Sequence, residues 1–296
     1  AEQQRVIREA AAAELTVENK SIDRHTTLGS VNIVDNDKNF LIVEGGRVRI
    51  DFNRRTGYMT RYDVGGESYL RQGSSLRPNF WRAPTDNDFG ADLQRKNRVW
   101  KNPKIDLTGL TAELRDGIVV VMAVYDLPSI PAKLSLEYKI NNAGEVVVKQ
   151  SMHAAADVSV PGLMRFGMRM EMPAEYDRVN YYGRGPWENY SDRKDASFIG
   201  IFSQTVGEQF YPYIRPQEMG TKSDLRWWHQ SNPGGRGLDF ISSEPFSASA
   251  LHYSQDSPDD GLEKRQGHAE EVRKQQAVIL RLDKGTTSLG CVTSWG

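Results

Sequence analysis

Residues 40–70 read FLIVEGGRVRIDFNRRTGYMTRYDVGGESYL, and this stretch decides the fold class. Apolar and polar residues alternate along it with a period of two, which is the spacing of a strand with one buried face. Three pairs of turn residues, Gly45-Gly46, Thr56-Gly57 and Gly65-Gly66, interrupt the alternation at short intervals. Short strands separated by such turns pair as antiparallel neighbours. The stretch therefore predicts an antiparallel sheet.

The same alternation recurs along the rest of the chain, always in short runs. Further strands are expected at residues 117–127, 132–140, 145–158, 163–172, 196–206, 237–243, 246–253 and 276–282. Asn141-Asn142-Ala143-Gly144 supplies the turn of a hairpin between the second and third of these runs. Only residues 261–276, GLEKRQGHAEEVRKQQ, have the composition of a helix. Many strands with almost no crossover helices predict an all-β protein with two large antiparallel sheets packed face to face.

The charges of the chain are nearly balanced, with 38 Lys and Arg against 39 Asp and Glu and a net charge of -1. No basic field is therefore expected to attract nucleic acid or an anionic membrane. No run approaches the roughly 18 apolar residues that span a bilayer, and residues 1–15 lack the pattern of a signal peptide. The single cysteine, Cys291, excludes an intramolecular disulfide and a thiolate metal cluster, and it leaves both cytoplasm and periplasm open as compartments.

Residues 76–90, LRPNFWRAPTDNDFG, combine prolines, aromatic residues and charges in a way that an ordinary strand does not. Pro78 and Pro84 fix the backbone and lack an N–H donor, so the segment is expected to form a loop or a sheet edge. The candidate polar residues of this loop are Arg82, Asp86, Asn87 and Asp88. Their donors and acceptors could bind sugar hydroxyls or a neighbouring domain, or could simply tie a buried loop together through Arg/Asp pairs.

Two further polar stretches, residues 177–195 (DRVNYYGRGPWENYSDRKD) and 209–220 (QFYPYIRPQEMG), are expected to form loops of the same kind. Their candidate residues are Arg184, Glu188, Asn189, Asp192, Arg193, Arg215 and Glu218. The carboxylates lie close to arginines in the sequence, so ion-paired scaffolding of the loops is the simpler interpretation. A divalent ion at Asp86/Asp88 or Glu188/Asp192 is a further alternative, although neither spacing matches a calcium loop.

These stretches resemble motifs of the large LacZ-like β-galactosidases of glycoside hydrolase family 2. Residues 76–90 are similar to the family's RxxFWRAPTDND signature, and residues 177–195 to its YxGxGPxENYxDR motif. Residues 209–220, the run FSASALHY (246–253) and the final Ser294-Trp295-Gly296 are also similar to family elements in the same order. The resemblance covers residues 40–296 and indicates the C-terminal region, which is the small chain or fifth domain.

The resemblance implies a particular fold and domain organisation. Residues 40–296 would form a large antiparallel β-supersandwich of the galactose mutarotase-like type. Residues 1–39 would be the remnant of a preceding immunoglobulin-like domain followed by a linker, although the alanine-rich residues 1–15 favour a helix on propensity alone. Residues 16–39 are polar and lack a period, which is typical of a linker.

The resemblance also implies a function for the parent protein, a retaining β-galactosidase that hydrolyses terminal non-reducing β-D-galactose. Its two catalytic glutamates, and its Mg and Na sites, lie on a TIM barrel that would precede residue 1, so this chain is expected to hold no catalytic residue, metal or cofactor. The expected partners are that barrel, within the same polypeptide, and the β-galactoside; a homo-oligomeric parent is compatible with the resemblance. Trp295 resembles the tryptophan that forms a platform for the galactoside. Gly290-Cys291-Val292-Thr293 stands where relatives often have Gly-Gly-Asp-Asp, so the hydrogen bonds of that loop are expected to differ.

Three other functions compete with this one. A glycosidase complete within the chain needs two carboxylates roughly 5 Å apart, and an aldose mutarotase needs a His beside a Glu, yet none of the five histidines stands beside a glutamate in a motif. An independent carbohydrate-binding module has more support, because aromatic side chains lie in the polar loops. These are Trp81, Trp187, Tyr190, Tyr211, Tyr213, Trp227 and Trp228. Trp81 and Trp187 are expected to be core plugs or interface anchors. If the adjacent Trp227 and Trp228 lie in a strand, they point to opposite faces of it.

Overall fold

The computed structural model describes residues 30–156, 158–265 and 267–287. The chain divides into two compact units. In the described part, one consists of residues 30–78 and 102–161 and is called the two-sheet unit. The other consists of residues 79–101 and 162–287 and is called the one-sheet unit. Each unit is made of two stretches of chain that are far apart in the sequence.

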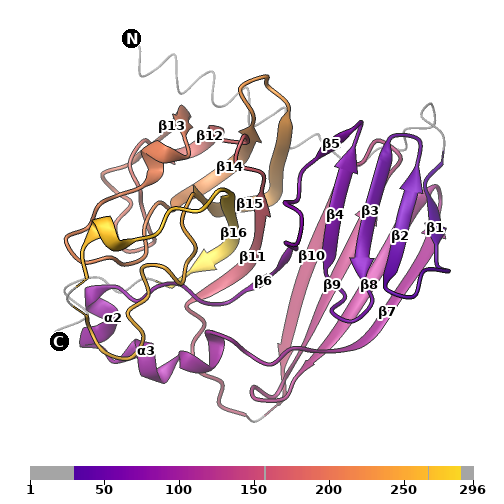
Figure 1. Cartoon of the computed structure of the whole chain (residues 1–296). Coiled ribbons are helices and arrows are strands. Elements are labelled where there is room, and N and C mark those ends of the chain that lie inside the picture. Colours follow the sequence, from indigo (N-terminus) through magenta and orange to yellow (C-terminus); the bar gives the residue numbers. More distant parts are fainter. Residues whose placement is uncertain (1–29, 157, 266, 288–296) are drawn as a thin grey trace. The chain divides into compact units, whose positions relative to one another are not determined.

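The two-sheet unit contains a five-stranded and a four-stranded sheet, and every neighbouring pair of strands is antiparallel (Figure 1). The five strands follow each other in chain order: β1 (Asn32–Val34), β2 (Phe40–Gly45), β3 (Val48–Asn53), β4 (Met59–Val64) and β5 (Glu67–Ser68). The four strands have the order β10-β9-β8-β7, with β7 (Asp106–Arg115), β8 (Ile118–Leu127), β9 (Ala132–Ile140) and β10 (Val146–Ala154). This meander needs only short turns, as the alternating pattern predicts.

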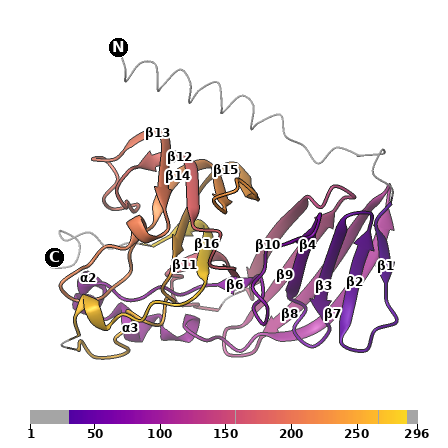
Figure 2. The same ribbon diagram turned by 45° about the horizontal axis from the view of Figure 1, so that its top comes forward.

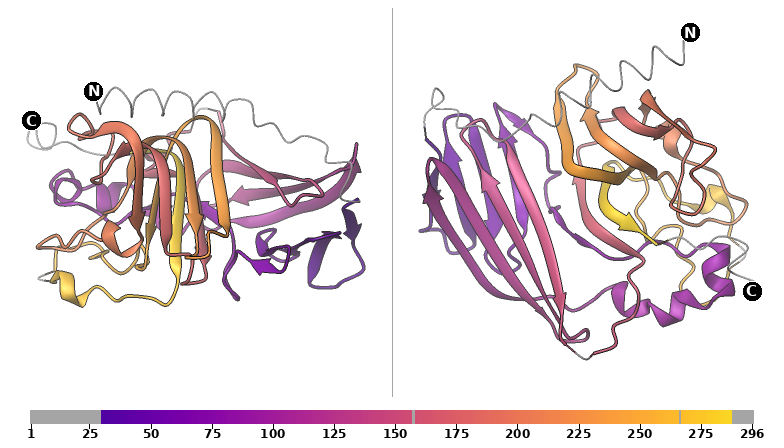
Figure 3. Two further views of the ribbon diagram at one scale, coloured as in Figure 1. Left: turned by 90° about the horizontal axis from the view of Figure 1, so that it is seen from above. Right: turned by 180° about the vertical axis from the view of Figure 1, so that it is seen from behind.

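The core of the two-sheet unit lies between its two sheets, which face each other in both views of Figure 3. Every second residue of β8 is buried, as expected for a strand with one face in the core. Phe52 of β3 meets Tyr138 of β9 edge to face, with ring centroids 4.9 Å apart. Aromatic contacts of this geometry add stability beyond the area they bury. The unit is therefore a β-sandwich.

The one-sheet unit is built on a seven-stranded sheet with the order β13-β12-β14-β15-β16-β11-β6 (Figure 2). Its strands are β6 (Arg77–Asn79), where the chain passes from one unit to the other, β11 (Arg165–Met172), β12 (Arg178–Gly185), β13 (Phe198–Thr205), β14 (Lys222–Ser231), β15 (Gly237–Leu251) and β16 (Val278–Thr286). Its helices are short: α2 (Asp86–Gly90), α3 (Leu93–Lys96), and the 3-10 turns η1 (Arg98–Trp100), η2 (Gly207–Gln209) and η3 (Ala269–Glu271). The loops between these strands carry the polar motifs.

Adjacent tryptophans in β14 show how this sheet buries one face. Trp228 is fully buried and stacks on Tyr181 of β12 with ring centroids 5.4 Å apart, whereas Trp227 is partly exposed. The two side chains therefore lie on opposite faces of the strand, as predicted. Trp81 is also buried, which confirms its expected place in the core.

Several sequence-based expectations need correction. Residues 261–276 form no α-helix in the described part of that segment, where only the short turn η3 is helical. Their backbone donors instead bind side chains, as when the Arg265 amide donates to Asp260 at 3.0 Å and the Gly261 amide to Asp259 at 2.8 Å. Such local bonds compete with helix formation. In the expected linker, residues 32–34 form β1 and pair with β2.

The strand predictions were mostly right about position. Residues 132–140 form β9, and Asn141 to Gly144 form the turn to β10, with Gly144 at a positive φ of 86°. The runs at 237–243 and 246–253 are parts of one long strand, β15, and the strands β7, β12 and β14 were not expected. The all-β class is confirmed. The mutarotase-like type and the domain boundary at residue 40 remain predictions.

Candidate functional site

Arg82 is one of the deeply buried candidate polar residues. Its side chain is buried, and its guanidinium donates to both carboxylate oxygens of Asp88, through Nη2 at 3.0 Å and through Nη1. It also donates to the backbone carbonyl of Thr287, from Nε at 3.1 Å and from Nη2 at 2.8 Å. A bidentate pair of this kind fixes the orientation of both side chains. Arg82 and Asp88 thus tie the loop together, which is the structural alternative considered for this motif.

The first turn after Pro84 holds Asp88 in place. The Thr85 side chain accepts from the Asp88 amide, while Asp88 Oδ2 accepts from the Thr85 amide at 2.7 Å. This reciprocal arrangement is a capping box and starts the five-residue helix α2. The Thr85-x-x-Asp88 spacing is typical of a capping box and could have predicted this helix. The nearby prolines favoured a loop instead. The neighbouring Asn87 lies in α2 and is partly exposed.

Asp86 joins the first loop to the loop at residues 209–220. Its Oδ1 accepts from Arg215 Nε at 2.9 Å and Nη2 at 2.6 Å, and Lys264 Nζ lies 2.9 Å away. Burial would raise the pKa of Asp86, but the hydrogen bonds and charges of Lys264 and Arg215 outweigh it and hold the pKa below its ordinary value. Arg215 also bonds Asp260 at 2.8 Å and lies over the Phe89 ring, so it has a scaffolding role.

Glu188 organises the loop after β12. It accepts from the Gly220 amide at 2.7 Å, from Arg193 Nη2 at 2.8 Å and from the Tyr213 hydroxyl. Arg193 in turn lies over the Tyr190 ring, 4.6 Å from its centroid. Glu188 is therefore committed to neighbours in the same unit, as the scaffolding interpretation expects.

Asn189, next in the chain, is fully buried and joins its loop to strand β14. Its Oδ1 accepts from the Ser223 amide at 3.0 Å and from the Ser223 hydroxyl, and its Nδ2 donates to the carbonyls of Arg184 and Trp187 at 3.0 Å. Arg184 binds Asp224 through Nε at 2.5 Å and the Ser197 carbonyl at 2.7 Å. Both residues maintain the shape of the loop.

Several buried charged residues form a cluster with Glu218, which is the one member of the cluster among the candidate residues. Arg165 of β11 donates to Glu218 Oε1 at 2.9 Å, and its Nε lies 3.1 Å from Asp283 Oδ2 of β16. Arg281 of β16 is also buried and donates to Ser249 at 3.4 Å. The sequence signal for this cluster is the presence of charged residues, Arg165, Arg281 and Asp283, within otherwise apolar strands. Their partners lie far away in the sequence, so the pairs could not be predicted.

The two carboxylates of this cluster titrate differently. Desolvation would raise the pKa of Glu218, but the charges of Arg165, Arg281 and Arg82 outweigh it and lower the pKa. Desolvation raises the pKa of Asp283 to about 7, despite the attraction of Arg165 and with a contribution from the charge of Glu218. Both acids are next to Arg165. Glu218 therefore stays ionised at neutral pH, whereas Asp283 takes up a proton at about pH 7. Burial also lowers the pKa of Lys222 to about 8, although Glu188 opposes the effect.

The structure brings six of the candidate residues around one small pocket of about 80 Å³ in the one-sheet unit. These are Arg82, Asp86, Asn87, Asp192, Arg193 and Glu218. Asp192 and Arg193 are exposed at the surface, whereas Arg82 and Glu218 are buried. Asp88, Arg184, Glu188, Asn189 and Arg215 support the surrounding loops instead. Trp295 lies outside the described residues.

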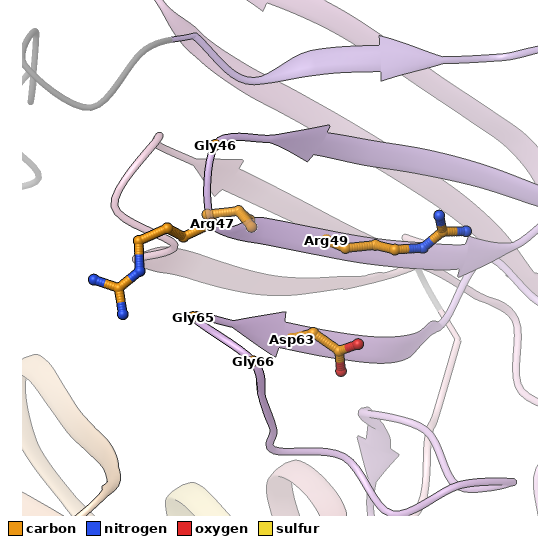
Figure 4. A pocket seen from close by; sticks show the side chains of 7 residues that line it. Gly46, Arg47, Arg49, Asp63, Gly65 and Gly66 are labelled. Carbon is orange, nitrogen blue, oxygen red and sulfur yellow. The ribbon is translucent and has the colours of Figure 1, made fainter.

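A second hollow, in the two-sheet unit, is an open surface between hairpin turns. Arg47 and Arg49 point in opposite directions along β3, with Asp63 on the neighbouring strand and Gly46, Gly65 and Gly66 in the turns (Figure 4). Arg49 is paired with Asp51 at 3.1 Å and Glu44 at 3.3 Å. Arg47 and Arg49 therefore do not form a common binding site for a ligand.

The exposure of Trp187 excludes one of its two expected roles. It was expected to be a core plug or interface anchor, but 73% of its surface is exposed, so it is not a core residue of this chain. Phe198 is 70% exposed on β13, where its partner across the sheet is Gly185, two residues before Trp187. Ile214 is 92% exposed and follows Tyr213, which binds Glu188. These three residues and the half-exposed Tyr211 are called the aromatic patch.

The described residues contain neither a candidate metal cluster nor a candidate membrane-spanning helix. Within residues 30–156, 158–265 and 267–287, no three His, Cys, Asp or Glu side chains gather into a group that could hold a metal ion. The described helices include none that is long and apolar enough to cross a membrane. His229 Nδ1 pairs with the exposed Asp239 at 2.7 Å, and His252 Nδ1 with the Ala277 carbonyl at 2.8 Å.

Comparison with known proteins agrees with the motifs. The sequence pattern of the family described as "Beta galactosidase small chain" matches residues 44–296. The chain is 34% identical over 223 residues to a β-galactosidase of Priestia megaterium, covering 75% of this chain and 21% of that protein. It is 32% identical over 232 residues to a β-galactosidase of Lactobacillus delbrueckii subsp. bulgaricus, covering 76% and 22%. It is 29% identical over 256 residues to β-galactosidase BgaC of Bifidobacterium adolescentis, covering 82% and 23%.

The chain thus spans about a fifth to a quarter of the length of these relatives. The match of the family pattern, in contrast, extends over nearly all of the chain. The protein therefore belongs to the β-galactosidase small-chain family.

Proposed function

We propose that this chain is the non-catalytic C-terminal region, or fifth domain, of a family 2 retaining β-galactosidase that hydrolyses terminal non-reducing β-D-galactose residues. The family match and the names of the relatives support this assignment. The chain's share of those relatives leaves room for a catalytic domain elsewhere in the parent polypeptide. We expect that domain to be a TIM barrel with the two catalytic glutamates and the Mg and Na sites.

The carboxylates of the motif loops support a structural role. A retaining glycosidase needs one carboxyl as acid and one as a free nucleophile. Here Glu188 is bound by Arg193 and Tyr213, and Glu218 by Arg165. A carboxylate surrounded by such donors is a poor nucleophile, because its lone pairs are already engaged.

The observation that carries the proposal is the aromatic patch. Trp187 precedes Glu188 in its loop, Phe198 pairs with Gly185 at the start of that loop, and Tyr211 and Ile214 lie close in sequence to Tyr213, which binds Glu188. All four expose large apolar surfaces. Apolar groups gathered on a surface commonly mark interaction sites, and aromatic residues are enriched at the centres of interfaces. We propose that this patch packs against the catalytic barrel, and that Trp295 completes one wall of its substrate pocket.

The same patch favours one alternative, an independent carbohydrate-binding module. Exposed aromatic rings beside carboxylates and arginines can stack on a pyranose and bind its hydroxyls. The two functions differ in what the isolated chain binds. Saturable binding of galactose or lactose at millimolar concentration, followed by NMR titration and retained after residues 288–296 are removed, would support the module.

Reconstitution tests the proposed function directly. The chain alone should not hydrolyse a chromogenic β-galactoside above background, and mixing it with the separately expressed preceding part of its parent should restore hydrolysis. Turnover by the repurified chain alone that is abolished by Glu188→Gln or Glu218→Gln would contradict the assignment.

A further inference from the structure

Lys222 is a buried cation that the candidate site does not use. It is the first residue of β14, only 2% of its surface is exposed, and no other lysine of the described residues is buried. Burial lowers the pKa of its amine to about 8, so the amine is still mostly protonated at neutral pH. A buried charge costs free energy unless a counter-ion or a hydrogen-bond acceptor compensates for it. Lys222 therefore needs a partner.

The described residues do not supply this partner. Among them, no hydrogen bond or ion pair reaches the Lys222 ammonium group, and only the charge of Glu188 favours its protonated form. Glu188 is itself committed to the Gly220 amide, to Arg193 and to the Tyr213 hydroxyl. The charge of Lys222 is thus left without a counter-ion of its own in this part of the chain.

The buried arginines of the same unit differ from Lys222 in this respect. Each one that the structure describes there donates to a carboxylate or to a carbonyl group: Arg82 to Asp88, Arg165 to Glu218 and Arg281 to Tyr253. Proteins break such a rule chiefly at functional sites, where a ligand or partner supplies the compensation. Lys222 has the properties of such a site.

The backbone around Lys222 is joined to the loop of the aromatic patch. The Thr221 carbonyl accepts from the Asn189 amide at 2.8 Å, and the Ser223 amide donates to Asn189 Oδ1 at 3.0 Å. The peptide groups on both sides of Lys222 are therefore bound to the loop that contains Trp187. A lysine side chain has a long flexible stem, so its ammonium group can move toward a partner that covers this loop.

We propose that Lys222 is an anchoring residue, which pairs with an aspartate or glutamate carboxylate of the polypeptide region that packs on the aromatic patch. This proposal rests on the function proposed for the patch, and it adds the charge of the partner surface. The apolar contacts of the patch exclude water from the ion pair and strengthen it. A free anion is a weaker candidate, because a net charge of -1 gives the chain no positive field that would concentrate anions.

Lys222→Met tests whether the charge lacks a partner within the 296-residue chain. Methionine has an unbranched side chain of similar length, so the variant loses the charge with little change in packing. We expect its midpoint of urea denaturation at pH 7 to be higher than that of the wild type. The folded pKa of about 8 lies below the unfolded value of 10.5, so the charge destabilises the folded chain fully below pH 8. The advantage of the variant should therefore decrease as pH rises from 8 to 10.5.

Lys284→Met is the matched control for this stability measurement. Lys284 lies on β16 of the same sheet, but its side chain is 60% exposed and pairs with Glu244, so the midpoint should hardly change. A Lys222→Met protein that is less stable than the wild type, or that does not fold, would mean that this chain already compensates the charge, and would overturn the proposal. It would also be overturned if sodium phosphate removed the stability difference at constant ionic strength, because a free anion would then be the partner.

Association with the separately expressed preceding part of the parent tests the partner. Lys222→Met would leave the partner's carboxylate buried without its cation, so the Kd should rise at least about tenfold. Lys284→Met should leave the Kd unchanged. Titration of the preceding part with each chain, followed by the recovery of β-galactosidase activity, measures the Kd.

Trp187→Ser/Phe198→Ser separates this proposal from the proposed function. If this patch variant and Lys222→Met both raise the Kd, both proposals are supported. If only the patch variant raises the Kd, the anchoring role of Lys222 is overturned and the function of the patch stands. If neither variant changes the Kd, the function proposed for the patch fails as well.

Discussion

Arg82 illustrates how a buried charge becomes a structural necessity. Its partners are Asp88 and two backbone carbonyls, so its removal would leave a buried carboxylate without its cation. Breaking one side of such a pair typically costs about 3–5 kcal/mol. We expect Arg82→Ala to lower the free energy of unfolding by that amount in chemical denaturation.

Arg178 provides a control for the Arg82 substitution. Its side chain is half exposed and pairs with the neighbouring Asp177 at 3.3 Å. Arg178→Ala should change the free energy of unfolding by no more than about 1 kcal/mol. An Arg82→Ala protein with wild-type stability but lost sugar binding would instead make Arg82 a ligand contact.

Asp283 should make stability depend on pH in an unusual direction. In the unfolded chain its pKa is close to 3.8, whereas burial raises the folded pKa to about 7. Between these values the folded state holds the proton more tightly, so the contribution of this group to stability falls as pH rises and is constant above about pH 7. Asp283→Asn removes this effect. The difference between the free energies of unfolding of the mutant and of the wild type, measured by urea denaturation, should therefore increase from pH 4 to pH 7. A difference that stays constant over this pH range would contradict the prediction.

The turn between β3 and β4 shows how a single glycine can be required for two reasons. Gly57 has a φ of 69°, and a Cβ there would lie 2.5 Å from the Tyr125 hydroxyl and 2.7 Å from Leu107. Gly66 has a φ of 89° but open space around it. Gly66→Ala should cost about 1 kcal/mol from the backbone alone. Gly57→Ala should cost about 2–4 kcal/mol, because displacement of packed side chains is added. If thermal denaturation shows equal losses of stability for Gly57→Ala and Gly66→Ala, the packing around Gly57 makes no additional contribution.

Periodicity predicted strands where a strand has one buried face and clear turn residues at its ends. Strand β9 and the turn at Asn141–Gly144 met both conditions. Strand β14 met neither, because Lys222 and Ser223 are buried polar residues and Asp224 has a positive φ of 52°. Local pattern cannot reveal such a strand, since its neighbours β12 and β15 supply the partners.

The candidate site could be predicted only in part for the same reason. Motif resemblance identified Arg82, Glu188 and Glu218, but not what each side chain binds. Arg165 and Asp283, which surround Glu218, are brought to it by β11 and β16. The partners of a buried charge depend on strand order, which a single sequence does not specify. Trp187 is not a core plug, because its proline and arginine neighbours do not enclose it; its other expected role, an interface anchor, stays a prediction.

The aromatic patch should matter for assembly with the catalytic region and little for folding. Trp187 and Phe198 are mostly exposed, so replacing both with serine removes few internal contacts. We expect Trp187→Ser/Phe198→Ser to keep wild-type thermal stability, within about 0.5 kcal/mol, and to weaken reconstitution of β-galactosidase activity at least about tenfold. Leu114→Ser is the control, because Leu114 is 51% exposed on β7, outside the patch. Equal losses for both variants would locate the interface elsewhere.

Trp295→Ala tests whether this region contributes to the substrate pocket of the parent enzyme. A platform tryptophan stacks on bound substrate and transition state alike, so its loss should raise KM by about tenfold and change kcat less. The melting temperature should hardly change, because the residue is not expected to fill the core of this chain. Steady-state kinetics and thermal denaturation of the same preparation separate these effects. A normal KM would mean that Gly290-Cys291-Val292-Thr293, in place of the acidic run of relatives, directs the loop away from the pocket.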